Sequence, residues 1–312
     1  SKGYVFNKEM SYCNNGSTLT WNENDNSVSV NINKTDKCYV YFDIYVPTLV
    51  EYVKSQYTGT QGENGLYYHD STLANGAGDN SYRYAGASDS VNNYICLGSD
   101  TTTCPDANLF RIIGVFGNQT KVIRAKSVGY QQWHTSADNT WSSSSLNAYL
   151  NGTYLTSLGT IAEKIATTTW KVGGGSGSNI SASVPATAYK NEVGSSASTT
   201  IIDKKIGLMY VSDYGFSAGP SAWTYNMNVY SSRIISSVNW MRSRISEWSI
   251  TRYSDSDGYA CILQSNGSVW VQVVNNGYEM LSGYSIRPVF FLNPSVIYAS
   301  GIGTQSDPIR LS

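Results

Sequence analysis

The sequence predicts an α+β fold whose main domain follows a small disulfide-stapled β module. Segments 27–32 and 37–45 alternate apolar and polar residues with the period of a half-buried strand. Two continuous apolar runs, 109–116 and 285–292, are typical of strands that are buried on both faces. Between these runs, the large side chains of 146–158 recur at helical spacing. Strands and helices in one chain therefore indicate the α+β class.

The first 47 residues form the β module. Cys13 falls near its first strand and Cys38 in its last strand, so a disulfide between them would staple a sandwich too small to hold by its core alone. Pro47 ends the pattern. The segment 48–57 then predicts a short helix with Thr48 as its N-cap.

Residues 48–107 join the module to the main domain as a helix and an irregular linker region. The segment 58–106 is rich in Gly, Asn, Ser and Tyr and has little periodicity, so we expect it to be irregular but ordered. A Cys96–Cys104 disulfide would pin it. Its aromatic anchors would be Tyr67, Tyr82, Tyr84 and Tyr94.

The main domain spans 108–312. A Gly-Asn-Gln turn between two apolar segments predicts that it opens with a hairpin. The elements expected along it are strands 109–116 and 120–125, helices 146–158 and 160–170, a loop at 172–185, a strand running into a turn at 205–216, a hairpin centred on Asn266-Gly267, and a last strand at 285–292.

Composition excludes some functions and favours a location. With 21 Lys and Arg against 22 Asp and Glu, the net charge of -1 gives no basic field, so nucleic acid is not an expected partner. Charged residues are 14% of the chain, and 25 Tyr stand against 7 Phe. A surface of Ser, Asn, Gly and Tyr is typical of secreted and adhesive proteins. The sequence has no stretch of about 20 apolar residues, so no membrane span is predicted.

The five cysteines indicate an oxidising location. None lies in a C-x-x-C or zinc spacing. Two short-range pairs, Cys13/Cys38 and Cys96/Cys104, suit disulfides, which we favour over a fully reduced chain. The remaining cysteine, Cys261, would then be a buried free thiol in a strand.

Several segments resemble those of known families in their sequence and in their order along the chain. The ending "EWSITR…YACILQSNGSVW…YSIRPVFFL" resembles the C-terminal half of C-type-lectin-fold domains of the formylglycine-generating-enzyme type, a group that includes ligand-binding proteins diversified by retroelements. "YRYAG…NNYICLGSD", "KIGLMYVSDYGFSA" and "RPVFFLNPSV" are similar to surface proteins of undefined function from gut Gram-positive bacteria. The resemblance implies a C-type-lectin-like fold for 108–312, with 109–116 and 285–292 as neighbouring strands. It also implies that Arg287 is held by polar partners.

Catalytic and metal sites are weaker interpretations. A catalytic triad could use His134 as the base and Asp138 as the residue that orients it. No G-x-S-x-G motif marks one of the many serines as the nucleophile, so the segment is expected to be polar surface. The oxidising enzymes of the resembled group use two cysteines in the C-terminal half. This chain has only Cys261 there, so their activity is not expected of it. Asp255 and Asp257 in "DSDG" are weak candidates for calcium, because the downstream acidic ligand of an EF-hand is missing. We therefore expect no cofactor, with calcium as the alternative.

A polar and aromatic ensemble near the C-terminus is the predicted ligand-binding face. Tyr and Trp give large contact area at low entropic cost, and Ser, Asn and Gly adapt their hydrogen bonds. If Ile262 and Val269 face the core, Trp270 and Gln272 lie outward. The competing interpretation is that the rings cap the core and the rest are loops. The predicted residues are Tyr253, Ser254, Asp255, Asp257, Tyr259, Gln264, Trp270, Gln272, Asn275, Asn276 and Tyr278.

The sequence thus predicts a non-enzymatic, extracellular binding protein of a bacterial cell surface. Its partner would be a protein or glycan on another cell or in the environment, met by a polar–aromatic, diversified face. One alternative is a structural pilus-tip or pseudopilin-type subunit. Another is an enzyme with an unrecognised site, which would require a pocket that gathers His134 or other titratable groups.

Overall fold

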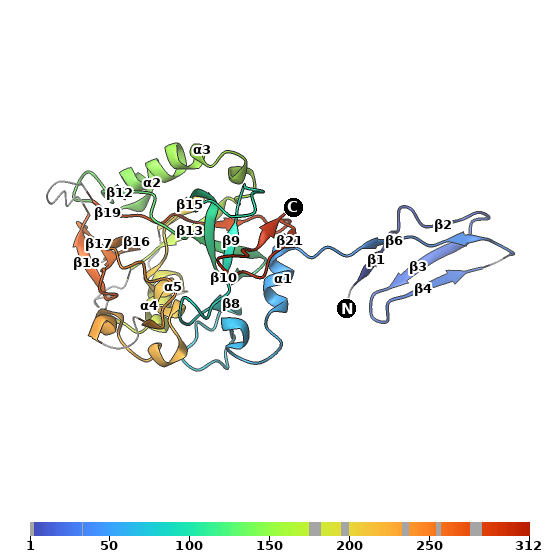
Figure 1. The fold of residues 1–312 in the computed structure, drawn as a ribbon, viewed down its shortest axis with the longest axis horizontal. Coiled ribbons are helices and arrows are strands. Elements are labelled where there is room, and N and C mark those ends of the chain that lie inside the picture. Colours follow the sequence, from blue (N-terminus) through green and yellow to red (C-terminus); the bar gives the residue numbers. More distant parts are fainter. Residues whose placement is uncertain are drawn as a thin grey trace. The chain divides into compact units, whose positions relative to one another are not determined.

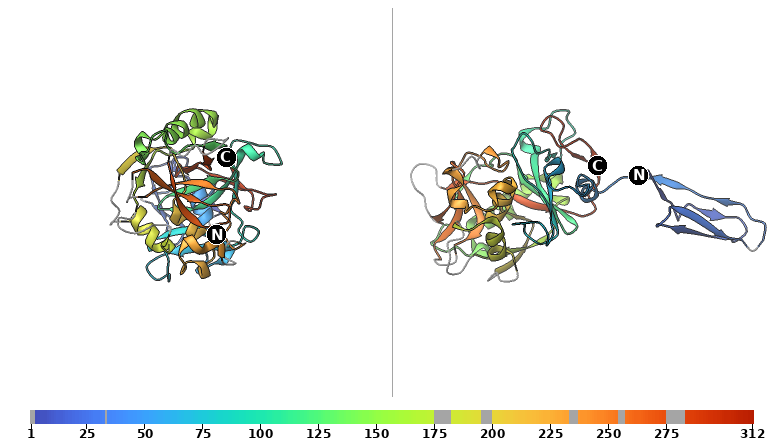
Figure 2. Two further views of the ribbon diagram at one scale, coloured as in Figure 1. Left: turned by 90° about the vertical axis from the view of Figure 1, so that its left-hand side faces the viewer. Right: turned by 90° about the horizontal axis from the view of Figure 1, so that it is seen from below.

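The protein is described from a computed structural model, which covers residues 3–32, 34–174, 182–194, 200–232, 237–253, 257–274 and 283–312. The chain divides into two units, Ser1–Pro47 and Thr48–Ser312. Figure 1 shows both units, and Figure 2 shows them from two further sides. Segments 48–107 and 108–312 therefore belong to one compact unit. Its mixed α+β architecture has many strands and few helices.

The N-terminal unit consists of three two-stranded antiparallel ribbons (Figure 1). They pair β1 (Tyr4–Phe6) with β6 (Phe42–Ile44), β2 (Tyr12–Cys13) with β5 (Cys38–Tyr39), and β3 (Thr18–Asn22) with β4 (Ser27–Asn31). The expected Cys13–Cys38 disulfide lies on the β2/β5 register. None of the described residues of this unit is buried. Within it, the rings of Phe6, Trp21 and Phe42 contact one another, and the ring of Tyr12 stacks on that of Tyr39.

The C-terminal unit begins with α1 (Leu49–Ser55), as predicted. The Thr48 hydroxyl accepts a hydrogen bond from the Glu51 backbone N–H (3.2 Å), and the Glu51 carboxylate accepts one from the Thr48 N–H (2.9 Å). This capping box satisfies two donors that a helix start would otherwise leave unpaired. Leu49, Val50 and Val53 bury the helix against the core.

A seven-stranded sheet forms the centre of this unit. Its order is β15-β20-β11-β10-β8-β7, with β9 also paired to β10. The strands are β7 (Leu66–His69), β8 (Ser81–Tyr84), β9 (Tyr94–Cys96), β10 (Leu109–Phe116), β11 (Gln119–Arg124), β15 (Ile206–Gly207) and β20 (Val289–Leu292). The predicted β10–β11 hairpin is confirmed.

The prediction of an irregular 58–106 is wrong in part. This segment supplies β7, β8 and β9, three strands of the central sheet. They are three or four residues long and separated by Gly- and Asn-rich turns, so no window shows a clear period. The predicted Cys96–Cys104 disulfide is present within this segment.

A five-stranded sheet, β12-β19-β16-β17-β18, lies in the same unit (Figure 1, orange strands β16, β17 and β18). Its strands are β12 (Tyr130–Gln131), β16 (Glu247–Arg252), β17 (Tyr259–Leu263), β18 (Val269–Val273) and β19 (Tyr284–Ser285). The hairpin at Asn266-Gly267 is confirmed, since β17 and β18 pair antiparallel across it. Cys261 is a buried free thiol on β17, as predicted.

Two expectations for 285–292 are wrong. The segment is divided between β19 and β20, because Pro288 lacks a backbone N–H and cannot continue a ladder. β11 lies between β10 and β20, so 109–116 and 285–292 are not neighbouring strands. Arg287 is held by polar partners as expected: its guanidinium donates twice to Glu247, at 2.7 Å each, and both side chains are almost fully buried.

The helical segment after 140 differs in part from the expectation. It runs through η3 (Trp141–Ser143), α2 (Ser145–Tyr149), a π turn η4 (Leu150–Tyr154), α3 (Leu155–Ser157) and η5 (Gly159–Glu163). The predicted helix 160–170 ends at Glu163. Thr168–Val172 is instead β13, paired with β14 (Thr200–Lys204), because three consecutive β-branched threonines favour an extended backbone. Half of the loop predicted at 172–185, residues 175–181, lies outside the described residues. At its ends, Val172 belongs to β13 and Pro185 begins α4 (Pro185–Glu192).

The strand predicted at 205–216 is the remaining correction. Only Ile206–Gly207 is extended, and Val211–Ser217 forms helix α5, which is buried throughout. The Asp213 carboxylate accepts a hydrogen bond from the Tyr210 backbone N–H at 2.9 Å, which starts the helix. A fully buried helix shows no apolar stripe, so its period cannot be distinguished from that of a buried strand.

The remaining elements are short. They are η1 (Glu63–Gly65), η2 (Asp106–Asn108), α4 (Pro185–Glu192), η7 (Pro220–Ala222), η8 (Met227–Ser232), β21 (Tyr298–Ser300) and β22 (Arg310–Leu311). No helix in the described part of the chain is long and apolar enough to cross a membrane.

Candidate functional site

The loop that connects β16 to β17 has a rigid base. The Tyr253 backbone N–H donates to the Tyr259 carbonyl at 3.0 Å, which closes the loop. The amide of Asn139 donates to the carbonyls of both Tyr253 and Tyr259 at 2.8 Å, and Asn139 is only 2% exposed. A buried amide that donates to both ends of one loop fixes the spacing of the two chain ends. The two tyrosine rings meet edge to face, with centroids 6.4 Å apart.

Two further segments reach the same end of the five-stranded sheet. The Val274 N–H donates to the Gly258 carbonyl at 2.9 Å, and the His134 N–H donates to the Val274 carbonyl at 3.2 Å. Residues 134–139, 253, 257–259 and 272–274 therefore converge, and together they are called the loop end here. Both the 253–259 connection and the chain leaving β18 start from it.

The structure brings together only part of the predicted ligand-binding face. Tyr253, Asp257 and Tyr259 lie at the loop end, where Asp257 is exposed and Tyr259 is 38% exposed. Gln272 lies opposite Ala260, next to this end. Ser254, Asp255, Asn275, Asn276 and Tyr278 lie outside the described residues.

Gln264 and Trp270 lie elsewhere on the hairpin. Gln264 precedes the Asn266-Gly267 turn, five residues from Tyr259, which corresponds to about 17 Å along a strand. Trp270 is opposite Ile262 on the edge strand β18 and is 48% exposed, while Ile262 and Val269 are buried. Trp270 and Gln272 share a face, because they are two residues apart on one strand.

His134 and Asp138 lie in the turn that flanks the loop end. The His134 Nδ1 accepts a hydrogen bond from the Ser136 N–H at 3.2 Å, and the Asp138 carboxylate accepts one from the Thr140 N–H at 2.8 Å. Hydrogen bonds from Thr140, with a smaller contribution from nearby His134, hold the pKa of Asp138 below its usual value. Both side chains are thus used to shape the turn. Four pockets lined by described residues do not include His134.

A second group of polar side chains, which sequence reasoning missed, is buried beside the seven-stranded sheet. The Lys121 ammonium donates to the Asp213 carboxylate at 2.5 Å, with each side chain 2% exposed. Arg83 lies 3.8 Å from the other Asp213 oxygen and bonds Asp79 at 2.7 Å. The one signal in the sequence was a lysine next to Val122 and Ile123 in a predicted strand of the main domain, where a charge that becomes buried requires a partner.

Glu192 adds a third carboxylate to this group. Its two oxygens accept hydrogen bonds from the backbone N–H groups of Val211 and Ser212, at 2.9 and 3.1 Å, and from the Thr251 hydroxyl. Burial nonetheless raises the pKa of Glu192 to about 7, because desolvation disfavours the ionised form. Burial also lowers the pKa of Lys121, against the opposing attraction of Asp213.

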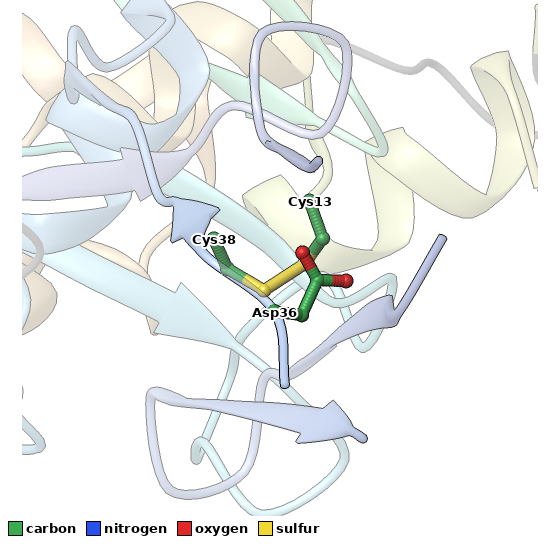
Figure 3. A group of neighbouring side chains, drawn as sticks. All are labelled: Cys13, Asp36 and Cys38. Atoms are coloured by element: carbon green, nitrogen blue, oxygen red, sulfur yellow. A yellow bond between two sulfur atoms is a disulfide. The ribbon is translucent and has the colours of Figure 1, made fainter. Parts of the chain in front are cut away.

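The described residues contain one geometric group of potential metal ligands, Cys13, Asp36 and Cys38 (Figure 3). The two cysteine sulfurs form a disulfide, so neither offers a thiolate to an ion. The Asp36 carboxylate is used as a turn brace: it accepts hydrogen bonds from the backbone N–H groups of Asn15, Ser17 and Lys37 at 2.7–2.9 Å. The group is therefore a disulfide with a neighbouring carboxylate.

Comparison of the chain with protein-family models, with curated proteins and with solved structures found no match. The two disulfides are typical of an oxidising environment outside the cytosol.

Proposed function

We propose that this chain is an extracellular ligand-binding protein of a bacterial cell surface, and that its ligand meets the loop end. The observation that carries the proposal is the Asn139 clamp. A buried side chain holds the two ends of a connection whose sequence is rich in Tyr, Ser and Asp at fixed spacing. Preorganised loops on a rigid sheet bind with less loss of entropy than free loops.

The chemistry of the loop end suits a protein or a glycan. The half-exposed Tyr259 offers an apolar ring with a hydroxyl, and the exposed Asp257 offers a hydrogen-bond acceptor. Such a ring stacks on a sugar or a peptide, and carboxylates and amides then select the partner by hydrogen bonding. Trp270 lies on the other face of the sheet, because it pairs with Ile262, three residues from Tyr259, and it is not part of the proposed surface.

The C-type-lectin-like fold is part of the proposal for residues 108–312. The start and end of the C-terminal unit lie together, because the Leu49 N–H donates to the Val296 carbonyl at 2.8 Å. The resemblance implied that strands 109–116 and 285–292 would be neighbours and bring the ends of the domain together, and β11 separates these strands. The contact between Leu49 and Val296 is what supports the assignment, by analogy of architecture.

The test is a glycan and protein array probed with the wild-type chain and with matched variants. Tyr259→Ala removes an exposed ring at the proposed surface. Trp270→Ala removes an exposed ring on the other face of the hairpin, and Tyr130→Ala removes one that is equally exposed (48%) on the other edge strand of the same sheet. We expect at least one array ligand whose binding falls about tenfold or more with Tyr259→Ala and stays unchanged with the other two substitutions. The absence of any array ligand, or equal loss in all three variants, would contradict the proposal.

A structural subunit remains the second candidate, and one observation favours it. The N-terminal unit exposes Tyr4, Phe42 and Ile44 at 66%, 46% and 72% on paired strands. Apolar side chains at such exposure on a short ribbon are typical of surfaces that a partner covers. Sedimentation of the full chain tests this candidate: concentration-dependent self-association that Ile44→Ser abolishes would support it, and a monomer at all concentrations would exclude it.

A further inference from the structure

A pocket of about 260 Å³ opens beside the seven-stranded sheet, away from the loop end. Its walls are the aromatic rings of Phe116, Trp170, Tyr189, Tyr210 and Phe291. Its polar lining comes from Lys121, Lys171, Ser212 and Asp213. Concave sites with apolar walls and a few convergent polar groups are the usual form of small-molecule sites. The volume suits a ligand that has one ring and one polar group.

Lys121 defines what the pocket can hold. Its ammonium lies 4.5 Å from the ring centroid of Tyr210, 5.3 Å from that of Phe116, and 5.5 Å from that of Phe291. The rings therefore already surround a cation that belongs to the protein. An ammonium has three N–H donors, and the hydrogen bond of Lys121 within the described residues goes to Asp213. Donor capacity remains for a ligand that accepts hydrogen bonds.

The charge of the lining selects the sign of the ligand. Among the described residues that line the pocket, two lysines stand against one carboxylate, Asp213. Arg83, which packs on the rings of Phe116 and Tyr189, has Asp79 as its ion-pair partner, so that pair adds no net charge. Lys171 is half-buried, with its ammonium 3.1 Å from the Val193 carbonyl. Glu192 accepts hydrogen bonds from Val211 and from the lining residue Ser212, and it is mostly protonated below pH 7 because burial raises its pKa to about 7. Below that pH the excess is positive and repels an incoming amine.

We propose that this pocket binds a small aryl carboxylate, with its ring between the aromatic walls and its carboxylate facing Lys121 and Lys171. Ring stacking supplies apolar contact, and the two ammonium groups supply charge-assisted hydrogen bonds. A ligand with the same ring and an amine lacks the second contribution and meets two like charges. The site is distinct from the loop end and does not depend on the function proposed for it.

Calorimetric titration of the full chain with three probes of matched size tests the proposal. The probes are phenylacetate, its neutral amide phenylacetamide, and the cation phenylethylamine. We expect saturable binding of phenylacetate with a dissociation constant of about 0.01–1 mM, which is the range for a ligand of this size. The amide should bind about tenfold more weakly, because it loses one charge-assisted contact. The amine should not bind.

Two variants locate the binding. Val193→Trp fills the pocket from its half-buried rim and should abolish phenylacetate binding, whereas Lys171→Gln should weaken it about three- to tenfold. Lys190→Gln removes an exposed lysine of α4 that is not part of the lining, and it should leave binding unchanged. Circular dichroism and the melting temperature establish that each variant is folded.

Several results would overturn the proposed aryl carboxylate site. Phenylacetate that shows no saturation up to about 10 mM, where binding would be weaker than any expected for this size, would refute the site. Equal binding of the amine would refute the charge argument. Binding that survives Val193→Trp in a folded protein would place the ligand elsewhere. If Val193→Trp does not fold, Lys171→Gln against Lys190→Gln decides, since equal affinity in those two variants contradicts the proposal.

Discussion

The two sheets of the C-terminal unit differ in how much of their strands is exposed to solvent. In the seven-stranded sheet, β10 is buried at every residue except Phe116, and the charges of Arg83, Arg111 and Lys121 all have buried partners. In the five-stranded sheet, edge strand β18 leaves Trp270 48% exposed, and Asp257 and Tyr259 are exposed where β17 begins. A strand that is buried along almost its whole length serves as scaffold. A sheet that ends in exposed rings and acceptors can meet a ligand.

The largest expected effect comes from breaking the Glu247–Arg287 pair, which ties β16 to the segment between β19 and β20. Glu247→Ala leaves a guanidinium that is 3% exposed without its carboxylate. An unpaired buried charge costs about 3–5 kcal/mol of unfolding free energy. Urea denaturation measures the loss. Lys126→Ala, in an ion pair of the same kind that is exposed, is the control and should cost about 1 kcal/mol or less. Equal losses of unfolding free energy in the two variants would contradict the distinction between a buried and an exposed ion pair.

The disulfide beside β9 comes next. Replacing both Cys96 and Cys104 by Ser opens a loop closed over eight residues of separation. The chain-entropy relation gives about 2–3 kcal/mol for a loop of this length. The denaturation midpoint of the C-terminal unit should shift accordingly. Cys261→Ser changes a buried thiol that makes no disulfide, and it separates disulfide loss from thiol loss. No shift in the double variant would show that β7–β9 are held by packing alone.

Glu192 should make stability depend on pH. Burial raises its pKa to about 7, from 4.5 in the unfolded chain. The folded chain therefore keeps a proton that the unfolded chain releases, and the free energy of unfolding falls as pH rises from about 4.5 to about 7. Glu192→Gln removes this dependence. The stability of wild type relative to the variant should be about 1–3 kcal/mol greater at pH 5 than at pH 8.

Denaturation of both proteins across that range measures the difference, and groups such as His69 that titrate in both proteins cancel. A constant difference between wild type and Glu192→Gln would mean that Glu192 is ionised throughout. Its hydrogen bonds from Val211, Ser212 and Thr251 would then outweigh its burial.

Asn139 is the point where the scaffold reaches the loop end. Asn139→Ala removes two hydrogen bonds and leaves the carbonyls of Tyr253 and Tyr259 without that donor, at a cost of about 1–2 kcal/mol. Hydrogen exchange of the Tyr253 amide should accelerate while that of β10 amides should not. Acceleration in both sheets would mean that the two are one cooperative unit, and the comparison between them would fail.

Sequence reasoning predicted the locally encoded features of the fold. The β10–β11 hairpin, the Thr48 cap and the β17–β18 turn each depend on residues within a few positions of one another. Both disulfides were also predicted, because each joins two cysteines that are close in the sequence. Helix α5 was predicted as a strand because all of its residues are buried, so it carries no periodic pattern.

The site was predicted less completely than the fold, for a physical reason. Lys121 and Asp213 are 92 residues apart, and nothing local in either segment specifies their contact. The clamp on the 253–259 connection comes from Asn139, more than a hundred residues earlier in the chain. Composition indicated Tyr253 and Tyr259 as surface rings. It could not separate them from Gln264, which lies at the opposite end of the same hairpin.

The smallest effect on stability and the largest on function should come from the same substitution. Tyr259→Ala removes a ring that is 38% exposed, and we expect it to change unfolding free energy by less than about 1 kcal/mol.

The most direct test of the central claim is the affinity of an array-identified ligand for Tyr259→Ala and for Tyr130→Ala. We expect the affinity to fall about tenfold or more for Tyr259→Ala and to stay unchanged for Tyr130→Ala, with both variants as stable as wild type. An unchanged affinity of Tyr259→Ala would contradict the claim that the loop end binds the ligand.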